Sequence, residues 1–283
     1  MIIEGPASTR LSERVASKIE EEIVSVESKV FPDGEIYIRL DGDVKGQDCC
    51  LIQTTYPNEN LLSLFFIQDA LIRSGARSIA TIVPYYSYSR QDQIFEKGEA
   101  LSSEVIAKII EFNSDKFYSV DLHSSTILNY FDITAYNLSA MMELADHSQI
   151  YDPDLLLSPD EGGIDRIKLA AEEVYLRWDY LEKHRLDGES VEIKPKNMDV
   201  EGKTVVILDD IISTGGTMGE AARQLYEQGA DEVHAGCTHG LFIGDSLKRL
   251  ESVCESVFCT DTIESPSSEV TVAPLIAEAI NDT

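Results

Sequence analysis

The stretch VVILDDIISTGGT, residues 205–217, predicts a buried strand that leads directly into a ligand site. Val205 and the three residues after it are continuously apolar, as in a parallel strand that helices cover on both faces. Two carboxylates, Asp209 and Asp210, follow at the carboxyl end of this strand. Open α/β sheets bind their ligands at that edge, so this stretch predicts both the fold class and the place of a site.

A turn of small residues comes next and opens a helix that we expect to run to about residue 228. Glycines let the backbone approach a ligand closely, and the free amides at a helix start, beside hydroxyls, form an anion cradle. Two acids for sugar hydroxyls and a cradle for a phosphate indicate a sugar-phosphate site. The structural alternative is a plain strand-to-helix turn capped by aspartate. The cradle residues are Ser213, Thr214, Gly215, Gly216 and Thr217.

Strand and helix patterns alternate on both sides of this stretch, which favours an α/β fold with mainly parallel sheets flanked by helices. A length of 283 residues suggests about two domains. We expect an N-terminal domain at 1–142 and a C-terminal domain at 143–283, with the tail 270–283 packing back on the first. The expected strands include 49–53, 78–84, 117–121, 155–158, 204–209, 232–237 and 256–260.

The composition is strongly acidic, with 51 Asp and Glu against 23 Lys and Arg and a formal charge of −28. This excess argues against nucleic-acid binding, which needs clustered cations. Because 43% of the residues are hydrophobic, we expect a folded protein with an acidic surface and not a disordered one. Concentrated salt screens such a surface, so we hypothesise a halophilic, salt-adapted origin.

Five cysteines, an odd number without any CxxC motif, predict buried thiols in a reducing compartment. The first residues lack the basic and apolar regions of a signal peptide. No apolar run approaches the roughly 20 residues of a membrane span. We therefore expect a soluble, cytoplasmic protein that does not contact a membrane.

Two motifs in the first half follow predicted strands and carry candidate nucleotide ligands. In PYYSYSRQD, residues 84–92, Arg90 could hold a phosphate and Gln91 could contact a base or ribose. The alternative is a tyrosine-rich interface turn. In DLHSS, residues 121–125, Asp121 and His123 can face one magnesium nucleotide if the backbone stays extended. Residues with purely structural partners are the alternative for this short motif.

Two motifs in the second half extend the sugar-phosphate hypothesis. SPDEGG, residues 158–163, repeats the order of strand, acid and paired glycines, so Asp160 could bind a metal or a sugar hydroxyl. A helix-starting turn is the alternative. Lys183 and Arg185 lie two apart and would share a face of an extended segment, where two cations suit a transferring phosphoryl group. An ordinary solvated strand edge fits them equally well.

FPDGE, residues 31–35, places an aromatic ring beside two carboxylates across a turn. Phe31 could stack on a base while Asp33 or Glu35 accepts its amino group, although a simple Pro-Asp-Gly turn explains the same letters. No GxxxxGK[ST] motif, zinc-ligand spacing or GxSxG elbow occurs in the chain. These absences argue against a P-loop kinase, a zinc site and a serine hydrolase of that type.

The order FPDGE, RQD, DLHS, SPDEGG, KxR, DDIISTGGT and VAPLIAEAI along one chain resembles the ribose-phosphate diphosphokinase family, in a compact, archaeal-like form. The resemblance implies two tandem type I phosphoribosyltransferase domains, with ATP on the N-terminal side and ribose 5-phosphate on the C-terminal side. It further implies Mg²⁺ as cofactor, a homo-oligomer, and transfer of the diphosphoryl group of ATP to the anomeric hydroxyl for nucleotide biosynthesis. AMP and 5-phosphoribosyl 1-diphosphate would be the products.

The resemblance also implies a role for each matching residue. The ATP ligands would be Phe31, Asp33 and Glu35 of a neighbouring subunit, with Arg90, Gln91 and His123. Metal would be bound at Asp121, His123 and Asp160. Ribose 5-phosphate would be bound at Asp160, Asp209, Asp210, Ser213, Thr214, Gly215, Gly216 and Thr217. The catalytic groups would be Lys183, Arg185 and His123.

The chain departs from the family pattern after RQD, where QIFEKGEAL has Lys97 as its single basic residue, and after DLH. These departures leave effector control and quaternary contacts open. A phosphoribosyltransferase that consumes phosphoribosyl diphosphate is one rival hypothesis, but it does not need FPDGE, RQD and DLH. A catalytically silent regulatory homologue is another, and it predicts loss of residues such as Lys183 or His123, which are present.

Overall fold

The structure is a computed structural model that describes residues 1–185, 191–194 and 198–282, with the backbone alone for 182–185 and 191–194. It divides the chain into two compact units. The first unit comprises Met1–Ser139 with Thr271–Thr283, and the second comprises Ala140–Val270. The sequence placed the division after residue 142, a position inside the helix α4 (Met141–Ser148), whereas the structure places it just before that helix.

The first unit contains a seven-stranded sheet in the order β3-β2-β1-β4-β5-β6-β7. Its neighbours are parallel except for the antiparallel hairpin of β2 and β3. The carboxyl ends of β5 and β6 therefore lie side by side at one edge. The strands are β1 (Ile2–Glu4), β2 (Ile23–Val30), β3 (Ile36–Leu40), β4 (Asp48–Ile52), β5 (Ser78–Val83), β6 (Lys116–Val120) and β7 (Thr134–Leu138).

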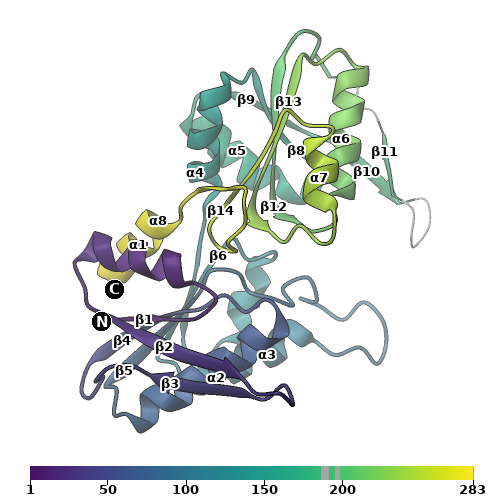
Figure 1. Cartoon of the computed structure of the whole chain (residues 1–283). Helices are drawn as coiled ribbons and strands as arrows, with labels where there is room; N and C mark the ends of the chain where they lie inside the picture. Colours follow the sequence, from purple (N-terminus) through teal and green to yellow (C-terminus); the bar gives the residue numbers. More distant parts are fainter. Residues whose placement is uncertain (186–190, 195–197, 283) are drawn as a thin grey trace. The chain divides into compact units, whose positions relative to one another are not determined.

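Helices cover both faces of this sheet (Figure 1). In α2 (Asn58–Arg73), Leu61, Leu64, Ile67 and Leu71 recur at helical spacing and pack into the sheet's core with residues of α3 (Ser102–Glu111). On the other face α1 (Thr9–Ile19) contacts α8 (Ala273–Asn281), the last helix of the chain. The short 3₁₀ helix η1 (Ser125–Tyr130) follows β6.

The second unit contains a six-stranded parallel sheet in the order β15-β14-β13-β12-β8-β9, beside a small antiparallel pair, β10 and β11. The strands are β8 (Leu155–Ser158), β9 (Arg177–Tyr180), β10 (Glu182–Arg185), β11 (Val191–Lys194), β12 (Thr204–Ile212), β13 (Glu232–Gly240), β14 (Ser256–Thr260) and β15 (Ser268–Val270). The helices are α4, η2 (Gln149–Tyr151), η3 (Glu161–Gly163), α5 (Ile164–Glu173), α6 (Gly216–Glu227) and α7 (Ser246–Glu251).

The central strand β12 shows why its sequence is continuously apolar. Val205 and Ile207 belong to a core cluster with residues of α6 and α7, and Val206 and Leu208 belong to a second cluster with residues of α4 and α5. Successive side chains of a strand point to opposite faces, so both faces of β12 are buried. The strand continues to Ile212, three residues beyond the predicted end at 209. The predicted α/β fold with two mainly parallel sheets is confirmed.

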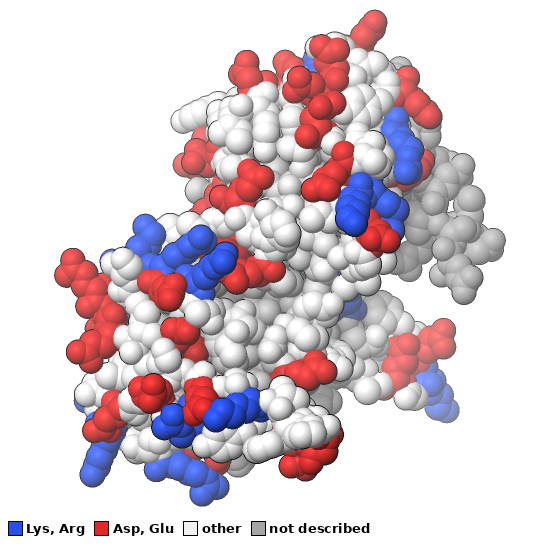
Figure 2. Space-filling view, viewed as in Figure 1, with Lys and Arg blue, Asp and Glu red and all other residues white. Residues whose placement is uncertain are grey.

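Figure 2 shows acidic side chains over both units on the face in view, with fewer basic ones interspersed. Four of the five cysteines are buried, Cys50 is partly buried, and all five are free thiols, as expected from their apolar surroundings. Among the described residues, no helix is long and apolar enough to cross a membrane.

Candidate functional site

The turn between β12 and α6, where the sequence predicts a phosphate cradle, lies in the second unit. Gly215 caps α6 with a φ of 73°, a left-handed conformation that glycine adopts without strain. Because a glycine cap has no side chain, it leaves the first amides of α6 available to an anion. Two hydrogen bonds fix the backbone of this turn. The backbone N–H of Ile243 donates to the Ser213 carbonyl at 3.0 Å, and Arg249 Nη2 donates to the Thr214 carbonyl at 3.1 Å.

The acid pair lies just before this turn, at the carboxyl edge of the sheet. β12 pairs with β8 only as far as Ile207, so Asp209 and Asp210 extend past the paired part on that side. Asp210 is buried, and its backbone N–H donates to Oδ1 of Asp209 at 2.8 Å. Burial, and then the charge of Asp210, raise the pKa of Asp209 well above its usual range.

Asp160 and Arg166 complete the group of charges around the acid pair. Asp160 follows β8, the neighbour of β12, and its charge also raises the pKa of Asp209. Nη2 of Arg166, on α5, lies 3.4 Å from Oδ1 of Asp210. The acid pair thus lies beside one guanidinium, with the charge of Asp160 acting on Asp209, and its carboxylates can accept hydrogen bonds from sugar hydroxyls or bind a hydrated cation.

The SPDEGG turn has a structural role as well as this charge. The Asp160 carboxylate accepts a hydrogen bond from the Gly162 N–H at 2.9 Å and caps η3, as the helix-starting alternative predicted. At Gly163 a Cβ would lie 2.2 Å from the Ser158 hydroxyl oxygen, so a larger residue would displace that side chain. The paired glycines therefore shape a turn, and they are not needed to explain an anion site.

Lys183 and Arg185 lie on β10, which follows β9 at the carboxyl edge of the same sheet. The backbone of β10 is extended, which is the conformation that the prediction of two cations on one face required. Their side chains lie outside the described residues, and their role stays a prediction.

In the first unit the structure brings the RQD and DLHSS segments together. They follow the neighbouring strands β5 and β6, in which Val83 pairs with Ser119. The hydroxyl of Tyr130, on η1, donates to the backbone carbonyl of Asp92 at 2.5 Å and ties the two segments to each other. Arg90 is exposed and Gln91 is half-buried at this edge.

The geometry of Asp121 and His123 differs from the prediction. An extended backbone was expected to turn both side chains toward one ligand, but Asp121 has a φ of 38°, in the left-handed region. Asp121 is buried and accepts a hydrogen bond from the Ser139 hydroxyl at 3.0 Å, whereas His123 is exposed. The expectation of an extended DLH segment is therefore wrong, because the chain turns sharply as it leaves β6.

FPDGE forms the tip of the β2–β3 hairpin. Phe31 is 48% exposed and makes an edge-to-face contact with Tyr37 of the same hairpin, while the Asp33 carboxylate accepts from the backbone N–H of Glu35 at 3.1 Å. Two strands, β1 and β4, separate β2 from β5. Three strand spacings amount to about 14 Å, so the sheet does not bring this tip beside Arg90 within one chain.

The described residues contain no cluster of three or more His, Cys, Asp or Glu side chains arranged to hold a metal ion. Magnesium does not require such a cluster, because it is usually bound by one or two carboxylates together with waters and substrate phosphates. The charge balance near Asp209 fits a cation of this kind, since the carboxylates there outnumber the guanidinium.

Comparison with known proteins matches both halves of this chain. Residues 1–113 match the N-terminal domain of ribose phosphate pyrophosphokinase, and residues 138–273 match the phosphoribosyl transferase domain. The ribose-phosphate pyrophosphokinase of Methanopyrus kandleri is 40% identical over 100% of this chain and 99% of its own length. The chain belongs to the ribose-phosphate pyrophosphokinase family. The predicted family is thus confirmed.

Further relatives agree over the full length. Ribose-phosphate pyrophosphokinase 2 of Archaeoglobus fulgidus is 40% identical, with 99% of each chain covered. The crystal structure of phosphoribosylpyrophosphate synthetase from Mycobacterium smegmatis superposes with a TM-score of 0.87 at 29% identity, covering 99% of this chain and 97% of that one. The match confirms the two-domain fold expected of a ribose-phosphate pyrophosphokinase.

Arg166 is a further candidate site residue, which the sequence motifs did not single out. Residues 117–165 contain no Lys or Arg, so Arg166 is an isolated cation directly after the SPDEGG turn. That isolation was a usable signal, but only the structure shows its distance to Asp210. Glu99, Tyr130 and Ser139 were also missed, because nothing local to them indicates which segment they contact.

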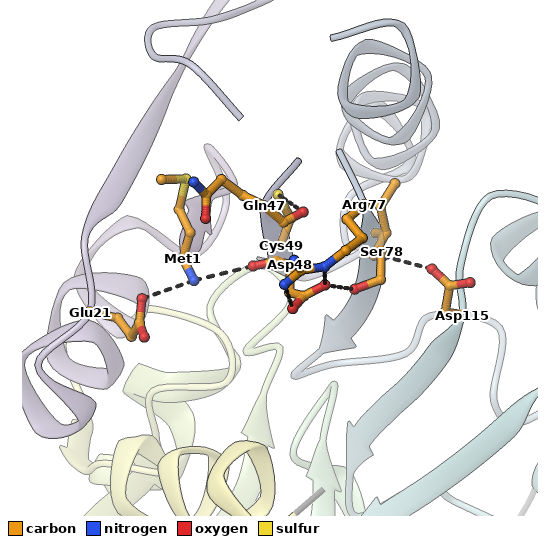
Figure 3. Close-up of polar contacts among 9 residues, drawn as sticks. Met1, Glu21, Gln47, Asp48, Cys49, Arg77, Ser78 and Asp115 are labelled. Atoms are coloured by element: carbon orange, nitrogen blue, oxygen red, sulfur yellow. Dashed lines mark hydrogen bonds and ion pairs between the residues drawn. The ribbon is translucent and has the colours of Figure 1, made fainter. Parts of the chain in front are cut away.

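A cavity of about 500 Å³ lies at the opposite, amino edge of the first sheet of this pyrophosphokinase-family chain, among the starts of β1, β4, β5 and β6. Figure 3 shows the polar contacts beside it, where Asp48 accepts hydrogen bonds from Arg77 Nε at 2.7 Å and from the Ser78 hydroxyl at 2.6 Å. Hydrogen bonds from Arg77 and Ser78 lower the pKa of Asp48. None of the predicted site residues lines this cavity.

Proposed function

We propose that this chain is a ribose-phosphate diphosphokinase. The oxygen of the anomeric hydroxyl of ribose 5-phosphate would attack the β-phosphorus of ATP, and the bond from that phosphorus to the oxygen shared with the α-phosphate would break. AMP would leave, the hydroxyl proton would pass to solvent, and 5-phosphoribosyl 1-diphosphate would form. The observation that carries the proposal is the placement of an acid pair directly before an anion cradle on β12, in a chain of this family.

The second unit supplies the proposed acceptor site. The backbone amides and hydroxyls of 213–217 would bind the 5-phosphate, and Asp209 and Asp210 would accept hydrogen bonds from the ribose hydroxyls. The carbonyls of Ser213 and Thr214 already have partners from α7 and the segment before it, which fixes the turn before substrate arrives. Such preorganisation is the main catalytic resource in phosphoryl transfer, where the protein does little covalent chemistry.

The first unit supplies the proposed ATP site. Arg90 would bind a phosphate, Gln91 would contact the nucleoside, and His123, exposed beside them, would contact ATP or its metal-bound phosphates. Asp121 is buried and bonded to Ser139, so we assign it to orienting this edge and to the metal's hydration shell. His123 and Gln91 lie on segments joined through Tyr130, which supports one shared ligand.

Mg²⁺ would neutralise the diphosphoryl oxygens when bound with ATP. On the acceptor side Asp160, with the acid pair, would bind a cation, because burial and the neighbouring carboxylates raise the pKa of Asp209 and a cation would offset both effects. On the donor side Asp121 and His123 are the candidates. A test is proton release on magnesium addition, which should fall in Asp209→Asn; an unchanged release would contradict the assignment.

Lys183 and Arg185 are proposed to stabilise charge on the transferring group. Lys183→Ala should lower kcat by about 100-fold or more while the KM values for ATP and ribose 5-phosphate change less than about threefold. Lys203→Ala, at a cation bonded to Asp199 on the same unit, is the matched control and should leave kcat unchanged. An unchanged kcat in Lys183→Ala would contradict the role.

The tip of the β2–β3 hairpin is the basis for a proposal of self-association. Phe31, Asp33 and Glu35 are exposed and lie far along the sheet from Arg90, so they would complete the adenine site of a neighbouring subunit. Mixing inactive Phe31→Ala with inactive Arg90→Ala protein should restore part of the activity, because mixed oligomers would contain intact shared sites. No recovery, in a mixture shown by light scattering to exchange subunits, would contradict this arrangement.

The reaction itself is tested with ATP, magnesium and ribose 5-phosphate in low and molar salt. AMP and phosphoribosyl diphosphate should form in equal amounts. Formation of ADP would indicate an ordinary kinase. Consumption of added phosphoribosyl diphosphate with a nucleobase, without use of ATP, would indicate a phosphoribosyltransferase.

A further inference from the structure

Gln91 is the residue proposed to contact the nucleoside, and every one of its polar groups except one makes a hydrogen bond to a described residue. Its backbone N–H donates to the Tyr88 carbonyl at 3.1 Å, and its own carbonyl accepts from the Ser103 hydroxyl at 2.7 Å. Its side-chain Nε2 donates to the Gln93 carbonyl at 3.2 Å and to Glu99 Oε2 at 3.1 Å. Among the described residues no donor is paired with its Oε1.

The orientation of the Gln91 amide follows from the chemistry of its neighbours. The oxygen and nitrogen of a glutamine amide are assigned from the hydrogen bonds that they make. Here both neighbours, a backbone carbonyl and a carboxylate, can only accept hydrogen bonds. The nitrogen must therefore face Gln93 and Glu99, and a flipped amide would place its oxygen against two other oxygens.

Glu99 is the residue that organises this geometry. One of its carboxylate oxygens accepts from Gln91 Nε2 and from the backbone N–H groups of Phe95 at 2.8 Å and Glu96 at 3.0 Å. The hydrogen bond from the Glu96 N–H, followed by that from Phe95, lowers the pKa of Glu99, so its carboxylate stays ionised at neutral pH. The segment after RQD departs from the common basic pattern, and the Glu99 carboxylate connects it to Gln91 by these hydrogen bonds.

We propose that Gln91 presents its Oε1 to a hydrogen-bond donor of the nucleoside, and that Glu99 is the positioning residue that enforces this choice. An oxygen acceptor cannot bind a phosphate oxygen, so the contact is made to an N–H or O–H group. ATP offers two such sources, the exocyclic amine of adenine and the ribose hydroxyls. This inference rests on the proposed function, since it names how the proposed ATP site selects its donor.

Nucleotide analogues distinguish the two sources. Purine riboside triphosphate lacks the amine, and 2′-deoxy- and 3′-deoxy-ATP each lack one hydroxyl. Wild type should use one of these about tenfold less efficiently than ATP, as expected for the loss of a single hydrogen bond. Gln91→Met, which keeps the length of the side chain without its acceptor, should lower kcat/KM for ATP by a similar factor and abolish the discrimination against that one analogue.

Glu99→Ala should weaken the discrimination, because the Gln91 amide then loses one of the two acceptors that orient its nitrogen. The KM for ribose 5-phosphate should not change. Glu96→Ala is the matched control, an acid in the same segment that contributes only backbone groups to the arrangement, and it should behave as wild type. Gln91→Met that keeps full discrimination against every analogue, or Glu99→Ala that keeps it, would overturn the proposal.

Equilibrium binding of ATP and the three analogues to the full chain separates this inference from the proposed function. If wild type binds ATP and discriminates one analogue through Gln91 but makes no AMP, the orientation stands and the proposed reaction fails. If AMP forms normally while Gln91→Met binds all four nucleotides as wild type does, the reaction stands and the orientation is wrong.

Discussion

Replacing Gly215 by alanine tests whether the turn after β12 is a preorganised phosphate cradle. Gly215 has a φ of 73°, and a Cβ at this position would lie 3.0 Å from two carbon atoms of Leu250. Leu250 is 1% exposed in the core, so it cannot move far. The turn must then shift by a few tenths of an ångström relative to α7.

Gly202 provides a matched control at the other end of the same strand. Its φ is 67°, but a Cβ there would meet nothing within 4 Å. An alanine in the left-handed region costs about 1 kcal/mol in either place. The contact with Leu250 adds about 1 kcal/mol for Gly215→Ala, and 1 kcal/mol corresponds to a fall in Tm of about 3 °C for a chain of this size.

The functional difference should be larger than the difference in stability. Loss of one charge-assisted hydrogen bond to the phosphate costs about 1.5–3 kcal/mol, so Gly215→Ala should raise the KM for ribose 5-phosphate roughly ten- to hundredfold. The KM for ATP should be unchanged, and Gly202→Ala should match wild type in both. Steady-state kinetics on variants shown to be folded by circular dichroism measure this. Equal KM values for ribose 5-phosphate in the two variants would refute the cradle.

Three further predictions concern charge. Burial raises the pKa of Asp209, so wild type should lose stability as pH rises above the ordinary pKa of an aspartate. Asp209→Asn should therefore become progressively more stable than wild type between pH 4 and 7 without ligands. Denaturant titration measures the difference, and a pH-independent one would refute the assignment. Arg166→Met should lower the free energy of unfolding by about 1–3 kcal/mol at neutral pH, because the buried Asp210 loses the guanidinium beside it. The double variant with Asp210→Asn should recover most of that loss in the same titration. Failure to recover it would show that the pair is not coupled. Because the net charge is −28, Tm should rise between low and molar KCl, and a flat melting series would exclude salt adaptation.

The sequence was most informative where local pattern and tertiary environment coincide. The apolar run from Val205 predicts a strand covered on both faces, and a core cluster packs against each face of β12. The acids and small residues that follow therefore lie at the carboxyl edge. The same reasoning placed Arg90 and Asp121 at one edge, because parallel neighbours end together.

The sequence was least informative about contacts between segments. A single positive φ at Asp121 turns the DLH motif away from the extended form that its letters suggested. The Glu99 carboxylate contacts Gln91 eight residues earlier, and Tyr130 reaches Asp92 across 38 residues. Thr271–Thr283 belongs to the first unit, on which the tail was expected to pack, but the contact of α8 with α1 is one that hydrophobic periodicity alone does not specify.

In the proposed reaction a diphosphoryl group passes intact from ATP to ribose 5-phosphate. Incubation with ribose 5-phosphate, magnesium and ATP labelled at either the α- or the β-phosphorus distinguishes this transfer from others. The β label should appear in phosphoribosyl diphosphate, and the α label should remain in AMP. Label from the β-phosphorus recovered in ADP, or no transfer at any salt concentration, would contradict it.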